Sequence, residues 1–373
     1  MIEDILARLV GFPTVAGAPN GAIVEWIRDY LDGFGAKVTV LPGPEGDRAN
    51  LFATIGPAER PGYILSGHMD VVTAAEPGWT ADPFTLRVDG TRLYGRGATD
   101  MKGFLACALA ALPSLVAAPL ARPVHLAFSY DEEAGCRGVG HMIEALPQLC
   151  ALPEGCIVGE PTGMRAIRAH KGKAAARVEI HGRSGHSSLP DQGLNAVHAM
   201  AGVLAVAVRS AEALKAGPFD VDFVPPYSSL QVGVIHGGQA INIIPDRCSA
   251  AIEARAIAGV SPATLLDPVR VAAQELAGQG FGVNWTVLSQ YPALSLNAGA
   301  PLAALLEELT GQEPLAAVSF GTEGGLYQVA GVPAIICGPG DIARAHRPDE
   351  YIDTGELTAC LRMIERLAMR LHT

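Results

Sequence analysis

The spacing of apolar positions divides the first 165 residues into short elements typical of an α/β domain. Apolar residues recur every three or four positions over 2–10 and 22–34, which predicts two amphipathic helices, the second ended by Gly33 and Gly35. Helices are also predicted over 101–112 and 138–145, and short apolar runs predict strands over 37–41, 50–55, 63–66 and 124–130. Strands that alternate with helices at this pace favour a mixed, mostly parallel sheet.

The pattern changes after Thr162. Alternating positions predict a half-exposed antiparallel strand over 171–181. The elements predicted after it are a helix over 193–214, strands over 228–236 and 248–256, a helix over 261–277 that Ser261 caps, and a strand over 282–288. This is the β-α-β-β-α-β order of ferredoxin-like domains. From residue 300 a helix, a strand over 334–337 and a terminal helix from 355 return to the first pattern.

The predicted architecture is therefore a discontinuous α/β domain, residues 1–165 and 285–373, interrupted by an inserted α+β domain at 166–284. Length agrees with two domains, since 373 residues exceed the ~250–300 at which a single core stops growing. A hydrophobic fraction of 49% excludes a disordered chain. The formal net charge of −11 argues against a protein that binds nucleic acid through a basic surface.

Neither a secretion signal nor a membrane span is predicted. The N-terminus is acidic and has no basic segment. Residues 104–121 carry no charge, but Pro113 and Pro119 interrupt them, which favours a buried helix that ends near Pro113. The seven cysteines form no Cys-x-x-Cys pair and are expected to be reduced thiols, so a cytoplasmic location is expected.

Histidine and carboxylate residues follow the predicted strands at several places. His68 and Asp70 stand two apart where a strand ends, so their side chains point to the same side, and one can orient the other's ring at a metal. Asp100 precedes a helix, where the alternative is an N-cap. Asp131, Glu132 and Glu133 follow another strand directly, although such a triplet is also common in solvated turns.

Two more candidates complete the set. Glu160 follows an apolar run, and His346 lies in the loop after the strand at 334–337. Ligands bind outside the carboxyl ends of parallel strands, and nitrogen and carboxylate donors without thiolate suit catalytic zinc or cobalt. Two ions need a bridging carboxylate, and one of two adjacent glutamates can act as general base. Together the residues fit a two-metal hydrolytic site.

At this point the sequence resembles the dinuclear metallo-aminoacylases and exopeptidases of the M20 group, most closely the acetylornithine deacetylases. The resemblance covers nearly the whole chain and rests on segments at 66–70, 79–84, 93–103, 131–133, 159–162, 168–172, 184–188, 338–340 and 346–350. It implies that Asp100 bridges two Zn²⁺ or Co²⁺ ions. His68 and Glu160 would complete one site, and Glu133 and His346 the other.

The resemblance also implies roles around the metals. Glu132 would be the general base, and Asp70 the partner that orients His68. His186 of the inserted domain would bind the tetrahedral intermediate, often from the partner subunit of a homodimer formed through that domain. The alternative for His186 is an ordinary turn residue beside Gly185.

Substrate recognition is expected at three positions. Asn242 and Arg255 match positions that the family uses for a substrate carboxylate, which a guanidinium binds through two parallel hydrogen bonds. An ordinary strand ion pair is the alternative for Arg255. Glu323, in a Gly-Thr-Glu segment, would attract the cationic end of ornithine. Glu253, where the subgroup usually has Asp, and the segment 256–259 depart from its pattern.

The predicted function is removal of the acetyl group from an N-acetyl amino acid, with N-acetyl-L-ornithine the expected substrate and arginine biosynthesis the expected context. N-acetylcitrulline, N-succinyl-diaminopimelate, a dipeptide or an N-carbamoyl compound would use the same centre. A serine hydrolase is disfavoured because no Gly-x-Ser-x-Gly occurs. The Gly-x-Gly-x-x-Ala match at 338–343 lacks the strand-turn-helix context of a nucleotide site. A metal-free binding protein on the same scaffold would be expected to have lost ligands, and none of the candidates is missing.

Overall fold

The computed structural model describes residues 1–372 and divides the chain into two compact units. Unit 1 comprises Met1–Ala169, Leu294–Ala317 and the residues from Thr322 onward, and unit 2 comprises His170–Ala293 and Val318–Gly321. Unit 2 begins later than the predicted 166, because the strand at Ile167–His170 pairs within the sheet of unit 1, and it ends later than 284, because its last strand continues to Tyr291. A short segment near residue 320 also joins it, which no feature of the sequence indicated.

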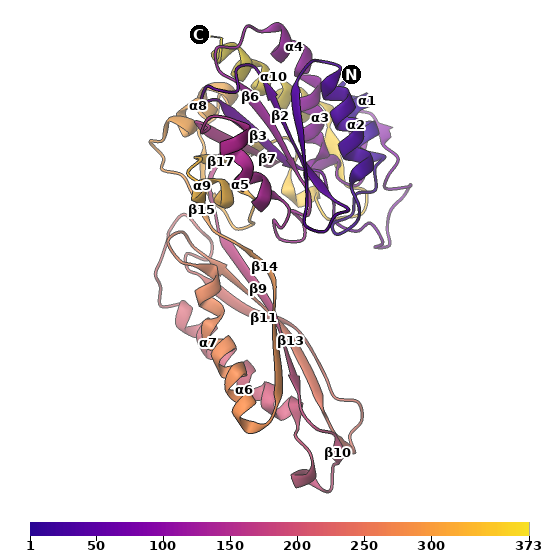
Figure 1. Cartoon of the computed structure of the whole chain (residues 1–373), viewed down its shortest axis with the longest axis vertical. Helices are drawn as coiled ribbons and strands as arrows, with labels where there is room; N and C mark the ends of the chain where they lie inside the picture. The colour runs from indigo at the N-terminus through magenta and orange to yellow at the C-terminus, as the bar shows by residue number, and fades with distance from the viewer. Residues whose placement is uncertain (373) are drawn as a thin grey trace. The chain divides into compact units, whose positions relative to one another are not determined.

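Unit 1 is built around a nine-stranded mixed sheet in the order β1-β2-β6-β3-β7-β17-β8-β15, with β16 paired to β8 (Figure 1). These strands are β1 (Lys37–Pro42), β2 (Ala49–Ile55), β3 (Tyr63–His68), β6 (Val124–Ser129), β7 (Gly155–Pro161), β8 (Ile167–His170), β15 (Leu294–Ser295), β16 (Leu315–Val318) and β17 (Ala334–Gly338). The central strands β6, β3, β7 and β17 run parallel, whereas β1, β2 and β8 pair antiparallel. The mixed, mostly parallel sheet is confirmed.

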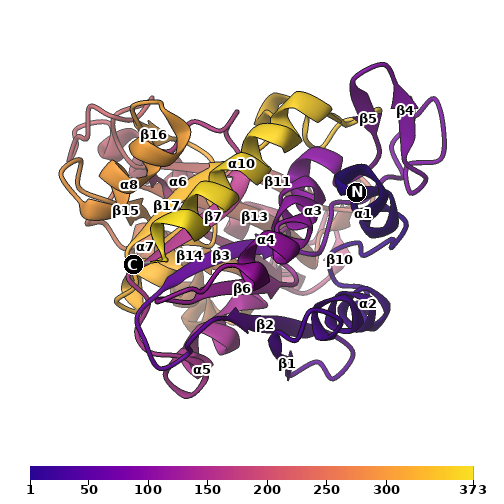
Figure 2. The same ribbon diagram turned by 90° about the horizontal axis from the view of Figure 1, so that it is seen from above.

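Helices cover both faces of this sheet (Figure 2). One face carries a continuous apolar core with α1 (Ile2–Val10), α2 (Gly21–Asp32), α3 (Gly103–Ala110), α4 (Leu112–Ala117), α8 (Pro301–Thr310) and α10 (Thr354–Arg370). The other face carries α5 (Val139–Leu149) and α9 (Gly324–Val329). A small sheet of β4 (Arg87–Asp89), β5 (Arg92–Tyr94) and β18 (Tyr351–Asp353) completes the unit.

The apolar segment at 104–121 begins with the predicted buried helix, α3, which ends at Ala110, but a second helix, α4, follows it and exposes one face. A π-helical turn (Ala98–Lys102) leads into α3, and α4 then continues to Ala117. Pro113 is tolerated because it lies in the first turn of α4, where its missing N–H costs no hydrogen bond. Residues 98–117 and α6 (Ala196–Leu214) are each long and apolar enough to cross a membrane by length and composition, but 78% of the most apolar window of 98–117 is buried in the structure. The first stretch therefore has the character of a core helix.

Unit 2 has the predicted β-α-β-β-α-β order. Its antiparallel sheet runs β11-β13-β9-β14, and α6 and α7 pack together on this sheet (Figure 1). The elements are β9 (Gly172–His181), β10 (Gly185–His186), α6 (Ala196–Leu214), β11 (Ser229–Gly237), β12 (Ile243–Ile244), β13 (Arg247–Ala256), α7 (Pro262–Glu275) and β14 (Gly282–Tyr291). Buried residues of α6 recur at helical spacing, at Ala196, Met200, Val203 and Ala207, which fixes the face that meets the sheet.

The predicted cap of α7 is only partly correct. Ser261 occupies the N-cap position and Pro262 the first helical position, but the Ser261 side chain makes no capping hydrogen bond. Instead, the Thr264 hydroxyl donates to the Ser261 carbonyl at 2.8 Å. Asn195 does cap α6, since its side chain accepts from His198 N at 3.0 Å.

Candidate metal centre

The carboxyl ends of the parallel strands gather the candidate ligands at one edge of the unit 1 sheet. His68 is the last residue of β3, Glu160 lies near the end of β7, and Asp131–Glu133 follow β6. His346 lies in the loop between β17 and β18. Since β6, β3, β7 and β17 are neighbours in that order, their ends meet, as the sequence predicted.

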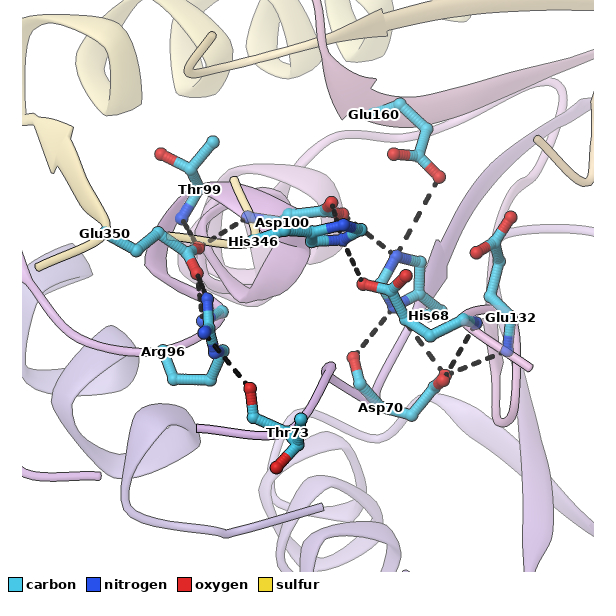
Figure 3. Close-up of polar contacts among 12 residues, drawn as sticks. His68, Asp70, Thr73, Arg96, Thr99, Asp100, Glu132, Glu160, His346 and Glu350 are labelled. Atoms are coloured by element: carbon cyan, nitrogen blue, oxygen red, sulfur yellow. Dashed lines mark hydrogen bonds and ion pairs between the residues drawn. The ribbon is translucent and has the colours of Figure 1, made fainter. Parts of the chain in front are cut away.

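Asp100 lies between the two histidines (Figure 3). Its Oδ1 is 3.1 Å from His68 Nε2, and its Oδ2 is 3.2 Å from His346 Nε2. Gly97, with φ of 81°, begins the π-helical turn that holds Asp100, a conformation that glycine adopts without a steric cost. Lys102 occupies the N-cap position of α3, so Asp100 is not the N-cap that the sequence left open, and each of its oxygens faces a different imidazole.

Each histidine has a second carboxylate beside it. Glu160 Oε1 lies 3.8 Å from His68 Nε2, and Glu133 Oε1 lies 2.9 Å from His346 Nε2. The donor atoms fall into two overlapping groups able to hold a metal ion, each with its atoms within 4.8 Å of one another: His68, Glu132 and Glu160, and His68, Asp100 and Glu133. The contacts of His68 with Glu160 and of His346 with Glu133 follow the expected pairing, whereas the two groups include Glu132 and leave out His346, so the assignment of ligands to two ions stays a prediction.

The charges of this cluster are unbalanced without cations. Burial, together with the charges of Asp100 and Glu132, raises the pKa of Glu160 well above its usual range. Burial opposes ionisation of Asp100 too, but hydrogen bonds from His346 and His68 hold the pKa of Asp100 well below its usual range. Hydrogen bonds to Asp100 and Glu133 raise the pKa of His346 to about 10. Protons on Glu160 and His346 therefore offset negative charge that bound divalent cations would otherwise offset.

The carboxylate of Asp70 binds the backbone of Glu132 and Glu133, whereas its backbone carbonyl contacts the His68 ring. His68 Nδ1 is 2.9 Å from the Asp70 carbonyl oxygen and 3.6 Å from its carboxylate. The carboxylate instead accepts hydrogen bonds from Glu132 N and Glu133 N, both at 3.1 Å. Asp70 therefore holds the ring through its main chain and the two glutamates through its side chain.

Glu132 is half-buried beside the ligands. Burial, opposed by His68 and reinforced by the charge of Glu133, raises the pKa of Glu132 to about 8. The thiol of Cys136, which is 5% exposed, donates to Glu132 Oε1 at 3.2 Å. A carboxyl with a raised pKa next to a metal site is suited to accept a proton near neutral pH. No feature of the sequence singled out Cys136.

The remaining candidate residues of the inserted domain lie in unit 2. His186 is exposed on β10, and its Nδ1 lies 2.6 Å from Ser188 Oγ. Asn242 is also exposed and lies close to His186 although it is far from it in the sequence. Its backbone carbonyl accepts a hydrogen bond from Ser187 N at 3.1 Å. The structure thus brings two of the three predicted residues of this domain together.

Arg255 lies on β13 and makes contacts within the sheet. Its Nε donates to Glu253 Oε1 at 2.8 Å, and its Nη1 donates to Tyr291 OH at 3.1 Å. This is the strand ion pair that the sequence left as the alternative. Binding of a substrate carboxylate by Arg255 stays a prediction.

Glu323 is buried at the start of α9, with 1% of its surface exposed. Its Oε2 lies 3.3 Å from the Ser66 hydroxyl on β3, and burial raises the pKa of Glu323 to about 7. Such burial favours a structural role for Glu323, which contacts β3 through Ser66. The predicted attraction of a cationic substrate group by Glu323 stays a prediction.

Two functional candidates were not identified from the sequence, although the motifs that contain them were. Arg96 and Glu350 are each 1% exposed and form an ion pair at 2.8 Å next to the Asp100 turn. Their charge gave no signal of burial, because Arg and Glu usually lie at the surface.

Comparisons with known proteins identify the family and the fold. The curated acetylornithine deacetylase of Myxococcus xanthus is 34% identical over 98% of this chain and 96% of its own length, and that of Edwardsiella ictaluri is 32% identical over 93% and 90%. An M20 family metallo-carboxypeptidase from Sulfolobus solfataricus has the same fold, with a TM-score of 0.81 at 17% identity over 100% of this chain and 99% of its own. A dinuclear metal-binding M20 peptidase from Bacillus subtilis superposes with a TM-score of 0.65 at 17% identity over 100% and 99%. The model of peptidase family M20/M25/M40 matches residues 64–370, which include every ligand placed above, and the chain belongs to this family of hydrolases that act on amide bonds.

Proposed function

We propose that the chain is a dinuclear metal-dependent amidohydrolase that removes the acetyl group from N-acetyl-L-ornithine, giving ornithine for arginine synthesis and acetate. The observation that supports it most is Asp100, whose two oxygens face two different histidines at 3.1 and 3.2 Å. A carboxylate placed in this way is suited to bridge two ions. The curated deacetylases similar to this chain over nearly its whole length support the choice of substrate.

The residues present fit two divalent ions. His68, Asp100 and Glu160 would hold one ion, and Asp100, Glu133 and His346 the other. These residues include several carboxylates and no lysine or arginine. Burial and the neighbouring carboxylates therefore raise the pKa of Glu160. Imidazole and carboxylate donors without thiolate favour Zn²⁺ or Co²⁺. When bound, such ions polarise the amide carbonyl and acidify the attacking water.

The protein's own groups would then move the proton. Glu132 takes a proton from water as the water oxygen bonds to the acetyl carbon, and it delivers that proton to the nitrogen as the C–N bond breaks. Acetate and the free amine result. Asp70 fixes the backbone of Glu132, and Cys136 fixes one of its carboxylate oxygens. His186 is proposed to donate a hydrogen bond to the oxyanion.

Glu132→Gln tests this assignment. The amide is nearly isosteric and cannot accept the proton, so we expect two bound metals and a loss of turnover of about 10²–10⁴-fold, the usual contribution of general acid–base catalysis. The measurement is acetate release together with metal content by plasma emission. Full turnover with stoichiometric metal would reject Glu132 as the base.

A panel of substrates tests the specificity. N-acetylornithine, N-acetylcitrulline, N-acetylmethionine, N-succinyl-diaminopimelate and simple dipeptides are compared with added Zn²⁺ or Co²⁺. If N-acetylornithine is among the poorest, the substrate assignment is wrong, although the metal chemistry survives. A chain that holds no metal and shows no chelator-sensitive hydrolysis would instead be a binding protein.

We also propose a homodimer formed through unit 2 and a location in the cytoplasm. The strand β11 is at an edge of its sheet, and Val234 and Ile235 on it are 48% and 50% exposed. An exposed apolar edge strand is a template for pairing with a second chain. All seven cysteines are free, as expected for a reducing compartment. Light scattering across a dilution series measures the oligomeric state, and a monomer at micromolar concentration would reject the dimer.

A further inference from the structure

The carboxylate of Glu350 is surrounded by donors from the turn that carries Asp100 (Figure 3). Its Oε1 accepts from Thr99 N at 2.9 Å and Asp100 N at 3.1 Å. Its Oε2 accepts from Gly97 N at 3.1 Å and Arg96 Nη1 at 2.8 Å. An ionised carboxylate offers about four acceptor positions, so these four donors fill it. Glu350 therefore has no free lone pair for a metal or a substrate.

Arg96 extends this network to a third segment. Its Nη2 donates to the Thr73 carbonyl at 3.1 Å and contacts Glu76, and its guanidinium lies 4.9 Å from the centre of the Trp79 ring. Arg96 is 1% exposed, and its charge is balanced by Glu350 and Glu76. The loop at 73–79, the turn at 95–100 and the loop at 346–350 are thus joined at one buried ion pair.

Two further hydrogen bonds to backbone carbonyls reinforce the same junction. Gly95 N donates to the Glu350 carbonyl at 2.9 Å, and the Thr99 hydroxyl donates to the Tyr351 carbonyl at 2.6 Å. Glu350 stands four residues after His346, and its side chain bonds the backbone N–H of Asp100. The two residues on either side of the second proposed metal position are therefore connected through one carboxylate.

We propose that Glu350 is a positioning residue, which holds the bridging Asp100 and the loop of His346 in register so that both meet the same ion. This inference rests on the proposed metal centre and adds a residue that neither binds metal nor touches substrate. Ligands that are held in place before binding lose less freedom when the ion arrives. Outer partners of metal ligands commonly affect metal affinity by about 10–100-fold.

The test is Glu350→Gln, with metal affinity as the readout. Apo-protein is titrated with Zn²⁺ against a chromophoric chelator, and Co²⁺ spectra report whether two ions share the site. We expect the weaker of the two binding constants to fall by about 10–100-fold, with circular dichroism of the folded apo-protein unchanged. Two ions bound with wild-type affinity and an unchanged Co²⁺ spectrum would overturn the proposal.

Glu356→Gln is the matched control. Glu356 also accepts from a backbone N–H, that of Asp353 at 2.9 Å, and from an arginine, Arg344 Nη1 at 2.8 Å, but it caps α10 and contacts no candidate ligand. We expect it to lower the melting temperature and to leave metal affinity unchanged. An equal loss of metal affinity in both variants would assign the effect to general destabilisation and reject the proposal.

If Glu350→Gln does not fold, Thr99→Val takes its place. This change removes the hydrogen bond to the Tyr351 carbonyl between the same two loops without disturbing a buried charge. We expect metal affinity to fall by about two- to tenfold, the share of one neutral hydrogen bond, and unchanged affinity would count against the proposal. A wild-type chain that binds no metal would instead reject the proposed function on which the inference rests.

Discussion

Replacing Asp70 by Asn would separate two ways in which this carboxylate can act. Its two oxygens accept from Glu132 N and Glu133 N at 3.1 Å each, whereas the His68 ring is held by the Asp70 carbonyl. Asn keeps that carbonyl and one side-chain oxygen, but its NH₂ group faces an N–H donor whichever way the amide turns. The variant therefore loses one hydrogen bond to a charged acceptor.

The size of the effect follows from that loss. A hydrogen bond to a charged group contributes about 1.5–3 kcal/mol, and ~1.36 kcal/mol corresponds to a tenfold change in rate. If the whole loss misplaces the general base in the transition state, kcat falls by about 10–150-fold. Because the His68 contact is retained, the loss is expected to persist when metal is saturating.

The assay measures kcat at increasing Zn²⁺ or Co²⁺, beside the melting temperature of the apo-protein. Asp220→Asn is the control, since Asp220 Oδ1 accepts from the backbone N–H of Asp222 at 3.1 Å in unit 2, and it should leave kcat unchanged. If excess metal restores full turnover to Asp70→Asn, the side chain acts on the metal ligands. That result would refute the claim that the Asp70 carboxylate acts by positioning Glu132.

Two further predictions concern Cys136, beside the site, and His125, near the start of β6. Cys136→Ala removes the thiol donor 3.2 Å from Glu132 Oε1 and should lower kcat by about two- to tenfold at unchanged KM. Cys136→Ser retains a hydrogen-bond donor and should restore kcat. Equal kcat in the wild type and both variants would contradict a role for the thiol in holding Glu132. His125 is fully buried, and burial lowers its pKa from 6.5 to about 4. The unfolded chain therefore binds an extra proton between these values, and the apo-protein should lose roughly 3 kcal/mol of stability as pH falls from about 6.5 to about 4. Denaturant unfolding measures the free energy of unfolding across this pH range. His125→Gln, which cannot titrate, should show a smaller change in this free energy with pH. An equal change in both proteins would show that His125 does not cause the pH dependence.

Local pattern was a good guide to the limits of several regular elements. The helix at 2–10 and the strands β1, β2 and β6 lie within a residue or two of their predicted limits, because an apolar period marks the buried face of a helix and a short apolar run marks a strand, with both faces buried in β2 and β6. Short elements such as α9 and β8 were not predicted. They have too few residues to display a period, and long-range packing against β17 and its neighbours determines them.

The sequence by itself determined which residues could do the chemistry. Donor types at strand ends, in the order of the M20 motifs, named both histidines and the carboxylates that the structure then brings within hydrogen-bonding distance. That success has a physical reason, since the carboxyl ends of parallel strands meet at one edge whatever the detail of the loops.

Only the tertiary structure decided how those residues are held. Asp70 proves to bind the backbone of the two glutamates, Glu323 lies buried under β3, and Glu350 fills its four acceptor positions at the Asp100 turn. Each of these contacts joins segments from about 60 to more than 250 residues apart in the chain. Burial and hydrogen-bond partners at such separations depend on the folded arrangement, which no local pattern of residues contains.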